Sequence, residues 1–331
     1  MNPRSAFKAH HRIEQSTVKL SAGRPCRAQW MTVPIDVEPH DHAYHEICLV
    51  TSGRATHRTK SGSAPLVPGD VFVVPPGEVH AIEDVDRFEV INAYYLTEWL
   101  MSDLGLLWSE PGAVPLFLST ALMKSQIVDT VQLRLDADAF DTVAAELRQI
   151  EAEFESVTPS QLLLRCCLQK AVATMARVWV SQDPTSATLA FRPEIWTAMD
   201  AIERAVIGGL PYSVAESAET ADLSVDHFST LFRSSTGYGP TDYFQRRRVH
   251  RACQLLLNPR PSVTEIAADL GYSDAPHFCR MFKRYKGLTP SEYRTIYNVR
   301  LDAGGLSEAS RTSRTSQLTI SSSSVGPTAG S

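Results

Sequence analysis

Positively charged side chains are concentrated in one part of this 331-residue chain, although its formal net charge is −5. Residues 1–191 contain 16 basic and 23 acidic side chains, a net charge of −7, whereas residues 228–300 contain 12 basic and 5 acidic ones, a net charge of +7. A segregated basic region is typical of a surface that neutralises the phosphates of a nucleic acid. The alternative, a solvated basic face without a partner, does not explain why the charge coincides with the helical repeat described next.

Residues 263–294 have the pattern of a short helix, a turn and a second helix, followed by a further helix. Ser262 and Glu265 form a predicted capping box that starts the first helix. Gly271 can take the positive φ that a sharp turn requires, and Ser273 is the expected N-cap of the second helix. This order of elements predicts a helix-turn-helix, whose second helix lies in the major groove of DNA.

The same pattern occurs once before in the chain. Helix caps, core positions and helix breakers repeat at a separation of 49 residues, and at 50 after one inserted residue. Ser213 thus corresponds to Ser262, and Phe228 to Phe278. Residues 241–257 have the length and periodicity of one continuous helix that joins the two units. If both second helices enter successive major grooves, they lie roughly 34 Å apart.

This doubled unit resembles the DNA-binding region of the AraC/XylS transcriptional regulators. The resemblance extends over residues 193–294, includes Arg248 and Ala252 of the joining helix, and is most specific in the run IAADLGYSDAPHFCRMFKRYKGLTPSEYR. Asp222 departs from the family pattern, which usually has a glycine at this turn. Thr230 is a second departure, at a position where the family commonly has an arginine. The first unit is therefore expected to read bases weakly, or to read a different sequence. The resemblance implies base-contacting positions at Asp226, Ser229, Thr230, Ala275, Pro276, Cys279 and Arg280.

The basic side chains are expected to make two kinds of DNA contact. Arg280 is the best candidate for a direct base contact, because a guanidinium can form two hydrogen bonds with one guanine. The other cations are assigned to phosphates, where they set affinity and salt dependence but not sequence choice. These phosphate-binding candidates are Arg246, Arg247, Lys283, Arg284 and Lys286.

A second set of residues suited to chemistry lies nearer the N-terminus. The motifs are His40-x-His42-x3-Glu46-x6-Gly53 and Gly69-x5-Pro75-x-Gly77-x2-His80. Both resemble the two motifs of the cupin barrel. By analogy with metal-binding cupins, the resemblance implies that His40, His42, Glu46 and His80 would ligate one divalent ion such as Zn, Fe, Mn or Ni. The alternative is a ligand pocket without metal, and no other cofactor is expected. We expect His45 to flank the site and His57 to lie in the pocket or on the surface.

The regions around these motifs predict an α+β fold. Residues 27–97 contain short runs rich in β-branched and aromatic side chains, separated by Gly and Pro, which predicts a jelly-roll or related barrel. Two long helices are predicted at 136–156 and 159–182. The second is apolar on more than one face and therefore needs two partners. We expect one of them to be a second subunit of a homodimer, with burial inside one subunit as the alternative.

Six segments follow from these patterns. An N-terminal segment (1–26), a sensor barrel (27–97), a helical dimerisation region (98–182) and a linker (183–192) precede the all-α DNA-binding domain (193–300). The Ser/Thr/Gly-rich tail (301–331) has too little apolar surface to offset the entropy of ordering, so disorder is expected there.

Composition places the protein in the cytoplasm. No apolar run approaches the roughly 20 residues needed to span a bilayer, and the N-terminus lacks the apolar core of a secretory signal. We therefore expect no membrane partner. The six cysteines show no paired metal-site spacing. They are expected to be buried free thiols in a reducing compartment.

Together these features predict a ligand-controlled transcriptional regulator that binds double-stranded DNA as a dimer and contacts RNA polymerase. The family resemblance favours activation. Similarity to its sugar-responsive members, including the rhamnose- and arabinose-responsive regulators, favours a carbohydrate effector by analogy. Two rival hypotheses are a metal-dependent cupin enzyme, such as an isomerase or dioxygenase, and a regulator gated by partner proteins. Two spaced recognition helices argue against an enzyme, which has no need of them.

Overall fold

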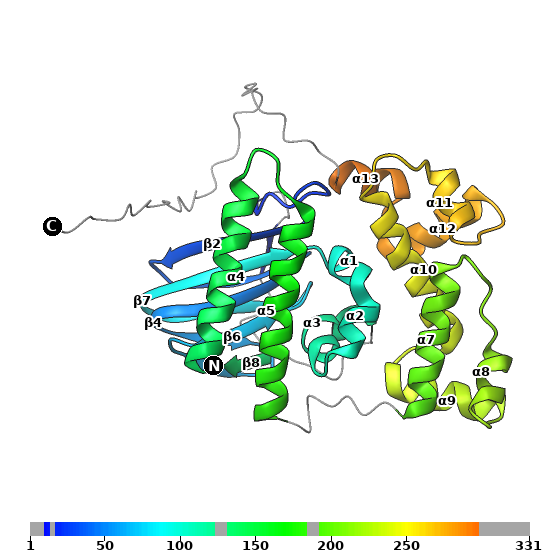
Figure 1. Ribbon diagram of the computed structural model, residues 1–331, viewed down its shortest axis with the longest axis horizontal. Coiled ribbons are helices and arrows are strands. Elements are labelled where there is room, and N and C mark those ends of the chain that lie inside the picture. The colour runs from blue at the N-terminus through cyan, green and yellow to red at the C-terminus, as the bar shows by residue number, and fades with distance from the viewer. Residues whose placement is uncertain (1–9, 14–16, 123–130, 184–191, 298–331) are drawn as a thin grey trace. The chain divides into compact units, whose positions relative to one another are not determined.

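The computed structural model describes residues 10–13, 17–122, 131–183 and 192–297, and every structural statement below concerns those residues. The strands and the helical pair lie in residues 11–182, and the regular elements of residues 193–297 are all helices (Figure 1). This arrangement confirms the predicted α+β fold class, with a sheet-rich first part and an all-α second part.

Two long antiparallel strands form the centre of the sheet. Strands β4 (His45–Thr59) and β7 (His80–Tyr95) pair along nearly their whole length. The order across the sheet is β1-β3-β7-β4-β6-β8, with β2 also paired to β7 and β5 to β4. The shorter strands are β1 (His11–Ile13), β2 (Cys26–Val33), β3 (Val37–His42), β5 (Ser63–Leu66), β6 (Asp70–Val74) and β8 (Val131–Arg134).

Both faces of the sheet are buried, as the alternation of side chains in β4 shows. Ile47 and Leu49 belong to one apolar cluster, whereas Cys48 and Val50 belong to another. The register of β4 on β7 shifts just beyond this point, which is the signature of β-bulges. Gly53 lies there with a φ of +73°, and a Cβ at this position would lie 2.0 Å from the carbonyl oxygen of Arg87. Only glycine allows this approach of the two strands.

The sheet extends beyond the predicted range of residues 27–97. Strand β1 belongs to the predicted N-terminal segment and pairs in parallel with β3. Strand β8 belongs to the predicted helical region and pairs with β6, where Arg134 Nε donates to Asp70 Oδ1 at 2.7 Å. Such short edge strands are specified by pairing with residues distant in the sequence, which explains why local patterns did not indicate them.

The two predicted long helices are confirmed and lie over the sheet in Figure 1. Helix α4 (Ala137–Glu155) begins after Asp136, whose carboxylate accepts from the backbone N–H of Ala139. Helix α5 (Gln161–Gln182) begins after Ser160, whose hydroxyl accepts from the N–H of Leu163. Short helices α1 (Thr97–Leu100), η2 (Met101–Asp103), α2 (Leu104–Ser109) and α3 (Ala113–Leu122) precede them. No helix in the described ranges is long and apolar enough to cross a lipid bilayer.

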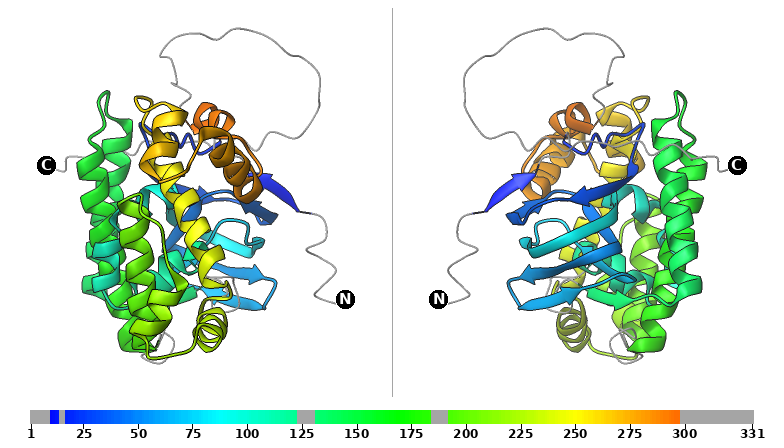
Figure 2. Two further views of the ribbon diagram at one scale, coloured as in Figure 1. Left: turned by 90° about the vertical axis from the view of Figure 1, so that its right-hand side faces the viewer. Right: turned by 90° about the vertical axis from the view of Figure 1, so that its left-hand side faces the viewer.

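The C-terminal helices, which face the viewer in the left view of Figure 2, form two units of matching build. Phe228 and Phe232 are fully buried in the first unit, and Phe278 and Phe282 occupy the equivalent positions in the second. The predicted repeat is therefore confirmed in three dimensions. Its helices are α7 (Pro193–Ile207), α8 (Val214–Thr220), α9 (Val225–Thr236), the joining helix α10 (Pro240–Leu256), α11 (Val263–Asp269), α12 (Ala275–Lys286) and α13 (Pro290–Tyr297).

Most of the predicted helix signals are confirmed. Ser262 and Glu265 form the capping box at the start of α11. Gly271 and Asp222 both adopt positive φ, +71° and +54°, at the two equivalent turns. The prediction that Ser273 caps α12 is wrong. The helix begins one residue later, and the carboxylate of Asp274 accepts from the N–H of His277 at 2.6 Å.

All six cysteines are free thiols. Four of them are buried, as expected, whereas Cys166 is exposed and Cys279 is half-buried. The expectation of full burial is therefore wrong for these two, which lie in α5 and α12. The predicted tail and nearly all of the predicted linker lie outside the described residues.

Candidate effector site and DNA-binding surface

Strand pairing brings the four predicted residues of the sheet domain together. His40 and His42 end β3, Glu46 lies at the start of β4, and His80 starts β7, opposite His40 in the register. All four side chains are buried. Positions 40 residues apart in the sequence thus form one buried polar cluster within an apolar sheet domain, as the resemblance to the cupin motifs implied.

The Glu46 carboxylate lies at the centre of this cluster. Its Oε2 atom is 3.1 Å from Nε2 of His42 and 3.8 Å from Nε2 of His80. The ring centroids of His40 and His80 are 4.3 Å apart. Burial lowers the pKa of His40 and holds the pKa of His80 well below its usual value. A buried group of imidazoles around a carboxyl group can bind a cation or a polar ligand.

Two further histidines pack around the cluster. His57 is buried, stacks on Phe72, and its Nε2 lies 3.4 Å from Nδ1 of His80. It is therefore buried beside the cluster and does not lie on the surface, the second of its two predicted positions. His45 flanks the cluster as expected, but its Nδ1 faces the hydroxyl of Thr97 at 2.7 Å. Burial lowers the pKa of His45 to about 3 and that of His57 to about 4, so both stay neutral at physiological pH.

The predicted base-contacting residues lie on the outer faces of α9 and α12. Asp226, Thr230, Pro276 and Arg280 are exposed, and the phenylalanines on the opposite faces are buried. Ser229, Ala275 and Cys279 are half-buried. Each helix therefore presents its predicted contact surface to solvent while its other face holds the unit together.

The predicted phosphate-binding cations differ in their availability. Lys283 and Arg284 are exposed at the C-terminal end of α12. Arg246 is half-buried, donates to Asp242 at 2.9 Å within α10, and lies 4.0 Å from the ring centroid of Tyr238. A partly exposed ion pair of this kind contributes little to the free energy of folding, so a phosphate can compete with Asp242 for Arg246.

Arg247 differs from the prediction. Its side chain is only 4% exposed and its guanidinium pairs with the Glu203 carboxylate, with Nη2 donating to Oε2 at 2.9 Å. The structure thus gives Arg247 a role in packing α10 against α7 in place of the predicted phosphate contact. Helical periodicity alone could not show this, because it depends on a partner 44 residues away.

Lys286 is also paired in this structure. Its Nζ donates to Oε1 of Glu98 at 2.7 Å, although 188 residues separate the two in the sequence. Burial alone would raise the pKa of Glu98, but the adjacent ammonium outweighs it and the pKa is lowered. Glu98 belongs to α1, directly after the sheet. The last turn of a recognition helix is therefore held by a carboxylate of the sensor region, a contact that the sequence did not indicate.

Arg248 links the joining helix to the turn of the second helix-turn-helix. Its Nε and Nη2 donate to the carbonyl oxygen of Leu270 at 2.9 and 2.7 Å. The guanidinium also lies 3.5 Å from the ring centroid of Tyr272. Burial lowers the pKa of Arg248, against the opposing influence of Tyr272. This side chain positions the turn, so it belongs to the scaffold of the DNA-binding surface.

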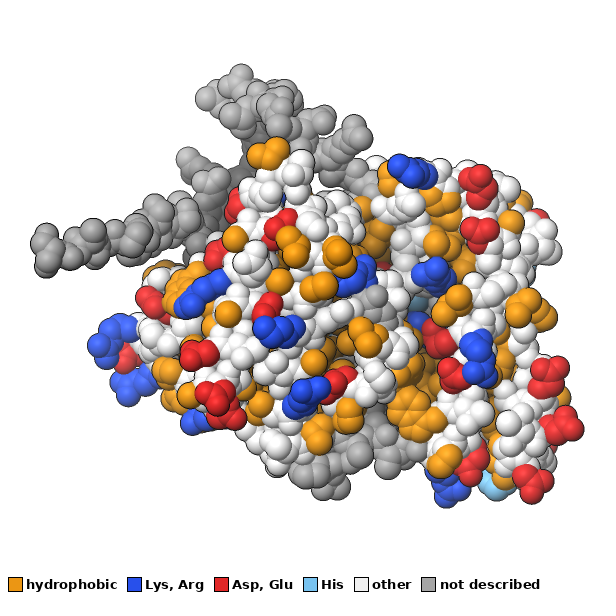
Figure 3. Space-filling view, in the orientation of Figure 1, with side chains coloured by type: hydrophobic (Ala, Val, Ile, Leu, Met, Phe, Trp, Pro, Cys, Tyr) orange, Lys and Arg blue, Asp and Glu red, His pale blue; other side chains and the backbone are white. Residues whose placement is uncertain are grey.

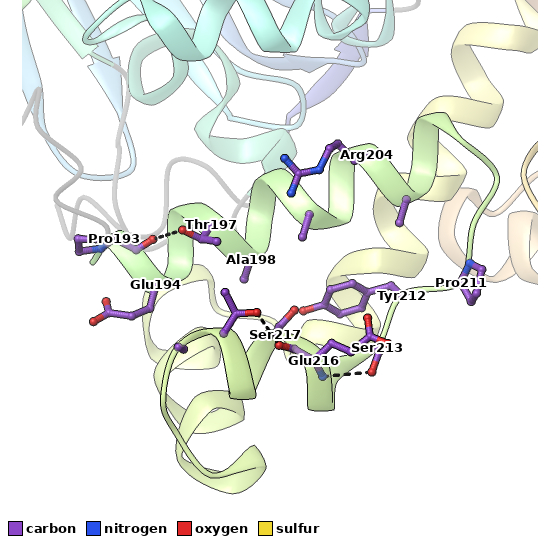
Figure 4. Close-up of a pocket in the computed structure, with 14 residues that line it drawn as sticks. Pro193, Glu194, Thr197, Ala198, Arg204, Pro211, Tyr212, Ser213, Glu216 and Ser217 are labelled. Atoms are coloured by element: carbon purple, nitrogen blue, oxygen red, sulfur yellow. Dashed lines mark hydrogen bonds between the residues drawn. The ribbon is translucent and has the colours of Figure 1, made fainter.

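A pocket of about 400 Å³ lies between α7 and α8 (Figure 4). Tyr212, Ser213 and Glu216 line one side of it, and Thr197 and Arg204 line the other. Ser213 and Glu216 are engaged in the N-cap of α8. None of the described residues of the His/Glu cluster or of the recognition faces lines this pocket, so it is separate from both predicted sites.

The face that carries α4 and α5 has mixed surface chemistry. Figure 3 shows apolar side chains interspersed with acidic and basic ones over these helices. Leu162 and Leu163, near the start of α5, are 69% and 47% exposed. The other face of α5 is buried against the sheet domain. The helix thus keeps apolar surface in solvent after its intramolecular packing is complete.

Comparison with known proteins agrees with this geometry. Residues 26–164 match the sequence model of the AraC-like ligand binding domain, and residues 217–296 match that of a helix-turn-helix domain. The HTH-type transcriptional activator RhaR of Mannheimia succiniciproducens is 23% identical over 78% of this chain and 87% of its own length. RhaR of Escherichia coli K12 is 24% identical over 78% and 86%. Among solved structures, ToxT of Vibrio cholerae O395 aligns over 83% of this chain and 100% of its own, with a TM-score of 0.42 and 12% identity.

Proposed function

The chain belongs to the AraC family of transcriptional regulators, and from this premise we propose that it is an activator controlled by a small molecule. The effector binds in the sheet domain at the His/Glu cluster, and a carbohydrate is the favoured class because the RhaR relatives resemble this chain over both domains. The observation that carries the proposal is the presence, in one chain, of an enclosed polar cluster and two exposed recognition helices of matching build. A metal-dependent enzyme has no use for the second feature.

The proposal includes the partners of such a regulator. Double-stranded DNA is contacted by the outer faces of α9 and α12, and RNA polymerase is contacted at the promoter. The exposed leucines at the start of α5 support a homodimer formed through this helix. The protein acts in the cytoplasm, where its DNA lies.

Genomic footprinting of the full chain tests the proposal. Cells are grown with and without candidate sugars, including rhamnose and arabinose, and protected sites are mapped. We expect protection of paired sites whose centres are about one helical turn apart, with occupancy that changes when one sugar is present. Failure of the purified chain to bind any double-stranded DNA at low ionic strength would contradict the proposal.

Replacement of Arg280 tests base recognition by the second unit. We expect Arg280→Ala to relax the preference at one base pair of the operator by about 1–3 kcal/mol, because a bidentate guanine contact is lost. Competition binding with operator variants measures the preference at each position. Lys283→Ala is the control: it removes an exposed cation of the same helix and is expected to weaken all sequences alike. Equal loss at every position in Arg280→Ala would assign Arg280 to phosphate.

Replacement of Glu98 tests whether the paired Lys286 is withheld from DNA. In Glu98→Gln the ammonium loses its carboxylate and becomes free to contact a phosphate. We expect the log–log dependence of affinity on salt to steepen by about 0.9, the increment for one further phosphate contact. Glu110→Gln is the control, because it removes the carboxylate that pairs with Arg177, away from the recognition helix. An identical salt dependence in Glu98→Gln and the native chain would show that Lys286 does not depend on this pair.

A further inference from the structure

We infer that Asp242 and Tyr285 fix the spacing of the two recognition helices, and with it the separation of the DNA subsites that one chain accepts. Asp242 lies in the first turn of the joining helix α10, and Tyr285 lies in the last turn of α12. The Tyr285 hydroxyl donates to Oδ1 of Asp242 at 2.8 Å, although 43 residues separate the two. The inference rests on the proposed function, because such a spacing matters only to a chain that binds DNA at two subsites.

The two helix-turn-helix units have separate cores, which gives a contact between them its importance. The phenylalanines of α9 pack in one apolar cluster with the first half of α10, including Tyr243. Those of α12 pack in another cluster with the second half of α10, including Val249. Contacts between the units then decide how far each can roll on the joining helix. Because Asp242 belongs to the half of α10 that packs in the first unit, its hydrogen bond to Tyr285 joins the two units.

Arg246 extends this contact to the end of α9. Its Nε donates to Oδ2 of Asp242 at 2.9 Å, and its guanidinium lies 4.0 Å from the ring centroid of Tyr238 and 5.2 Å from that of Tyr285. Tyr238 is the second residue after α9 and packs against the core of the first unit, whereas Tyr285 packs against that of the second. These four side chains therefore connect the C-terminal ends of both recognition helices through one turn of α10.

The charge states of the two partners strengthen the hydrogen bond. Burial alone would raise the pKa of Asp242, but hydrogen bonds from Arg246 and Tyr285 outweigh it and the pKa is lowered. Burial and the adjacent carboxylate raise the pKa of Tyr285 to about 12. At physiological pH Asp242 is therefore an anion that only accepts, and Tyr285 keeps the proton that it donates. Hydrogen bonds with an ionised acceptor are stronger than those between neutral groups.

The repeat shows why the Asp242 carboxylate is available for this contact. Asp242 corresponds to Glu292 at the separation of 50 residues. In the second unit, the Glu292 carboxylate accepts from the backbone N–H and the hydroxyl of Thr289 at 2.7 and 2.8 Å. In the first unit, Gly239 occupies the position of Thr289, and the start of α10 has no side-chain cap hydrogen bond. The carboxylate of Asp242 is thus not used within its own unit in this way and bonds to the other unit.

A distance measurement without DNA tests the inference. Spin labels are attached through unnatural amino acids in place of His227 and His277 of the full chain, which are exposed and hold equivalent positions on α9 and α12. We expect a narrow distance distribution when Tyr285 is present and a broader one in Tyr285→Phe, which lacks only the hydroxyl. Tyr243→Phe is the matched control, because the buried hydroxyl of Tyr243 has no hydrogen-bond partner among the described residues. An unchanged distribution in Tyr285→Phe, or equal broadening in Tyr243→Phe, would overturn the inference.

Binding of the unlabelled full chain tests the consequence for operator choice. A duplex selected from a random-sequence library is compared with the same duplex carrying one base pair inserted between its two subsites, which moves them apart by roughly 3.4 Å. We expect the native chain to prefer the original duplex. We expect Tyr285→Phe and Asp242→Ala each to narrow the ratio of the two affinities by about 3–10-fold, the range of a typical net hydrogen bond. The double variant is expected to narrow it no further, because both changes remove the same contact.

A duplex with a single subsite separates positioning from general damage to the DNA-binding surface. We expect its affinity to stay the same in Tyr285→Phe, because the second unit keeps its own core and contact face. A native spacing ratio in Tyr285→Phe, or fully additive effects in the double variant, would contradict the inference. If the native chain binds no duplex at all, the proposed function fails, whereas the distance measurement still decides the role of Tyr285.

Discussion

Gly271→Ala is expected to destabilise the DNA-binding region by about 2–5 kcal/mol and to abolish tight binding to a two-site operator. The estimate combines about 1–2 kcal/mol for a side chain in the left-handed region with about 1–3 kcal/mol for overpacking at a close contact. Gly271 has a φ of +71°, and a Cβ there would lie 2.2 Å from the carbonyl oxygen of Gly209. The added methyl group would meet the backbone of Gly209, which cannot rotate away as a side chain could.

The contact between the two glycines is reciprocal. Gly209, just after α7, also has positive φ, and its own Cβ would lie 2.3 Å from the carbonyl oxygen of Asp269. The end of the first helix of the domain thus touches the turn of the second helix-turn-helix. Separation of these segments changes the position of α12 relative to α9, and therefore the match to two successive grooves.

Gly287→Ala provides the matched control. Gly287 caps α12 with a φ of +75°, but a Cβ there would meet nothing within 4 Å. Gly287→Ala therefore places a side chain at positive φ, with its conformational penalty, but introduces no steric clash. We expect denaturant unfolding to show a clearly smaller loss for Gly287→Ala than for Gly271→Ala. Equal losses would mean that the approach to Gly209 does not constrain the domain.

Arg248→Met is the second substitution with a large expected effect. We expect a loss of about 2–4 kcal/mol in the free energy of unfolding. The carbonyl oxygen of Leu270 would be left buried without its donors, which costs about 1–3 kcal/mol, and the contact with Tyr272 would lose up to about 2 kcal/mol of cation–π attraction. Methionine fills a similar volume, so the loss reports the polar contacts and not a cavity.

Two further variants separate these contributions. Arg251→Met removes an arginine from the same helix whose Nη1 donates to Gln254 in its own helix, and a smaller effect is expected. Arg248→Lys keeps the charge but cannot donate two hydrogen bonds from a planar group, so we expect partial loss. Chemical denaturation followed by far-UV circular dichroism measures all three. A loss in Arg251→Met equal to that in Arg248→Met would contradict the assigned role.

The two helix-turn-helix units could be predicted from the sequence because the signals that define their helices are local. The Ser262–Glu265 capping box, the glycine at 271 and the phenylalanines at helical spacing each act within one or two turns of the chain. Their repetition at a fixed separation then identified the second copy. The error at Ser273 is of the same local kind, because Asp274 is also a good N-cap and the two choices differ by a single residue.

The His/Glu cluster was predicted by motif, although its geometry was not. The resemblance to the cupin motifs placed His40, His42, Glu46 and His80 in one site, and the strand register brings them together. That His57 supports His80 depends on the pairing of β4 with β7. Pairing between distant residues also decides which cations reach solvent. Arg247 and Arg284 look alike in sequence, but Arg247 is buried and paired with Glu203, whereas Arg284 is exposed.

The ion pair between Glu98 and Lys286 has a thermodynamic consequence. Glu46 adjoins His45, His45 contacts Thr97, and Thr97 adjoins Glu98. The proposed effector cluster and the proposed phosphate contact of Lys286 are thus linked by a short series of neighbouring residues. Coupling of this kind is reciprocal. An effector that weakens the ion pair of Lys286 with Glu98 would raise the affinity for the operator. Operator binding must then raise the affinity for that effector by the same factor.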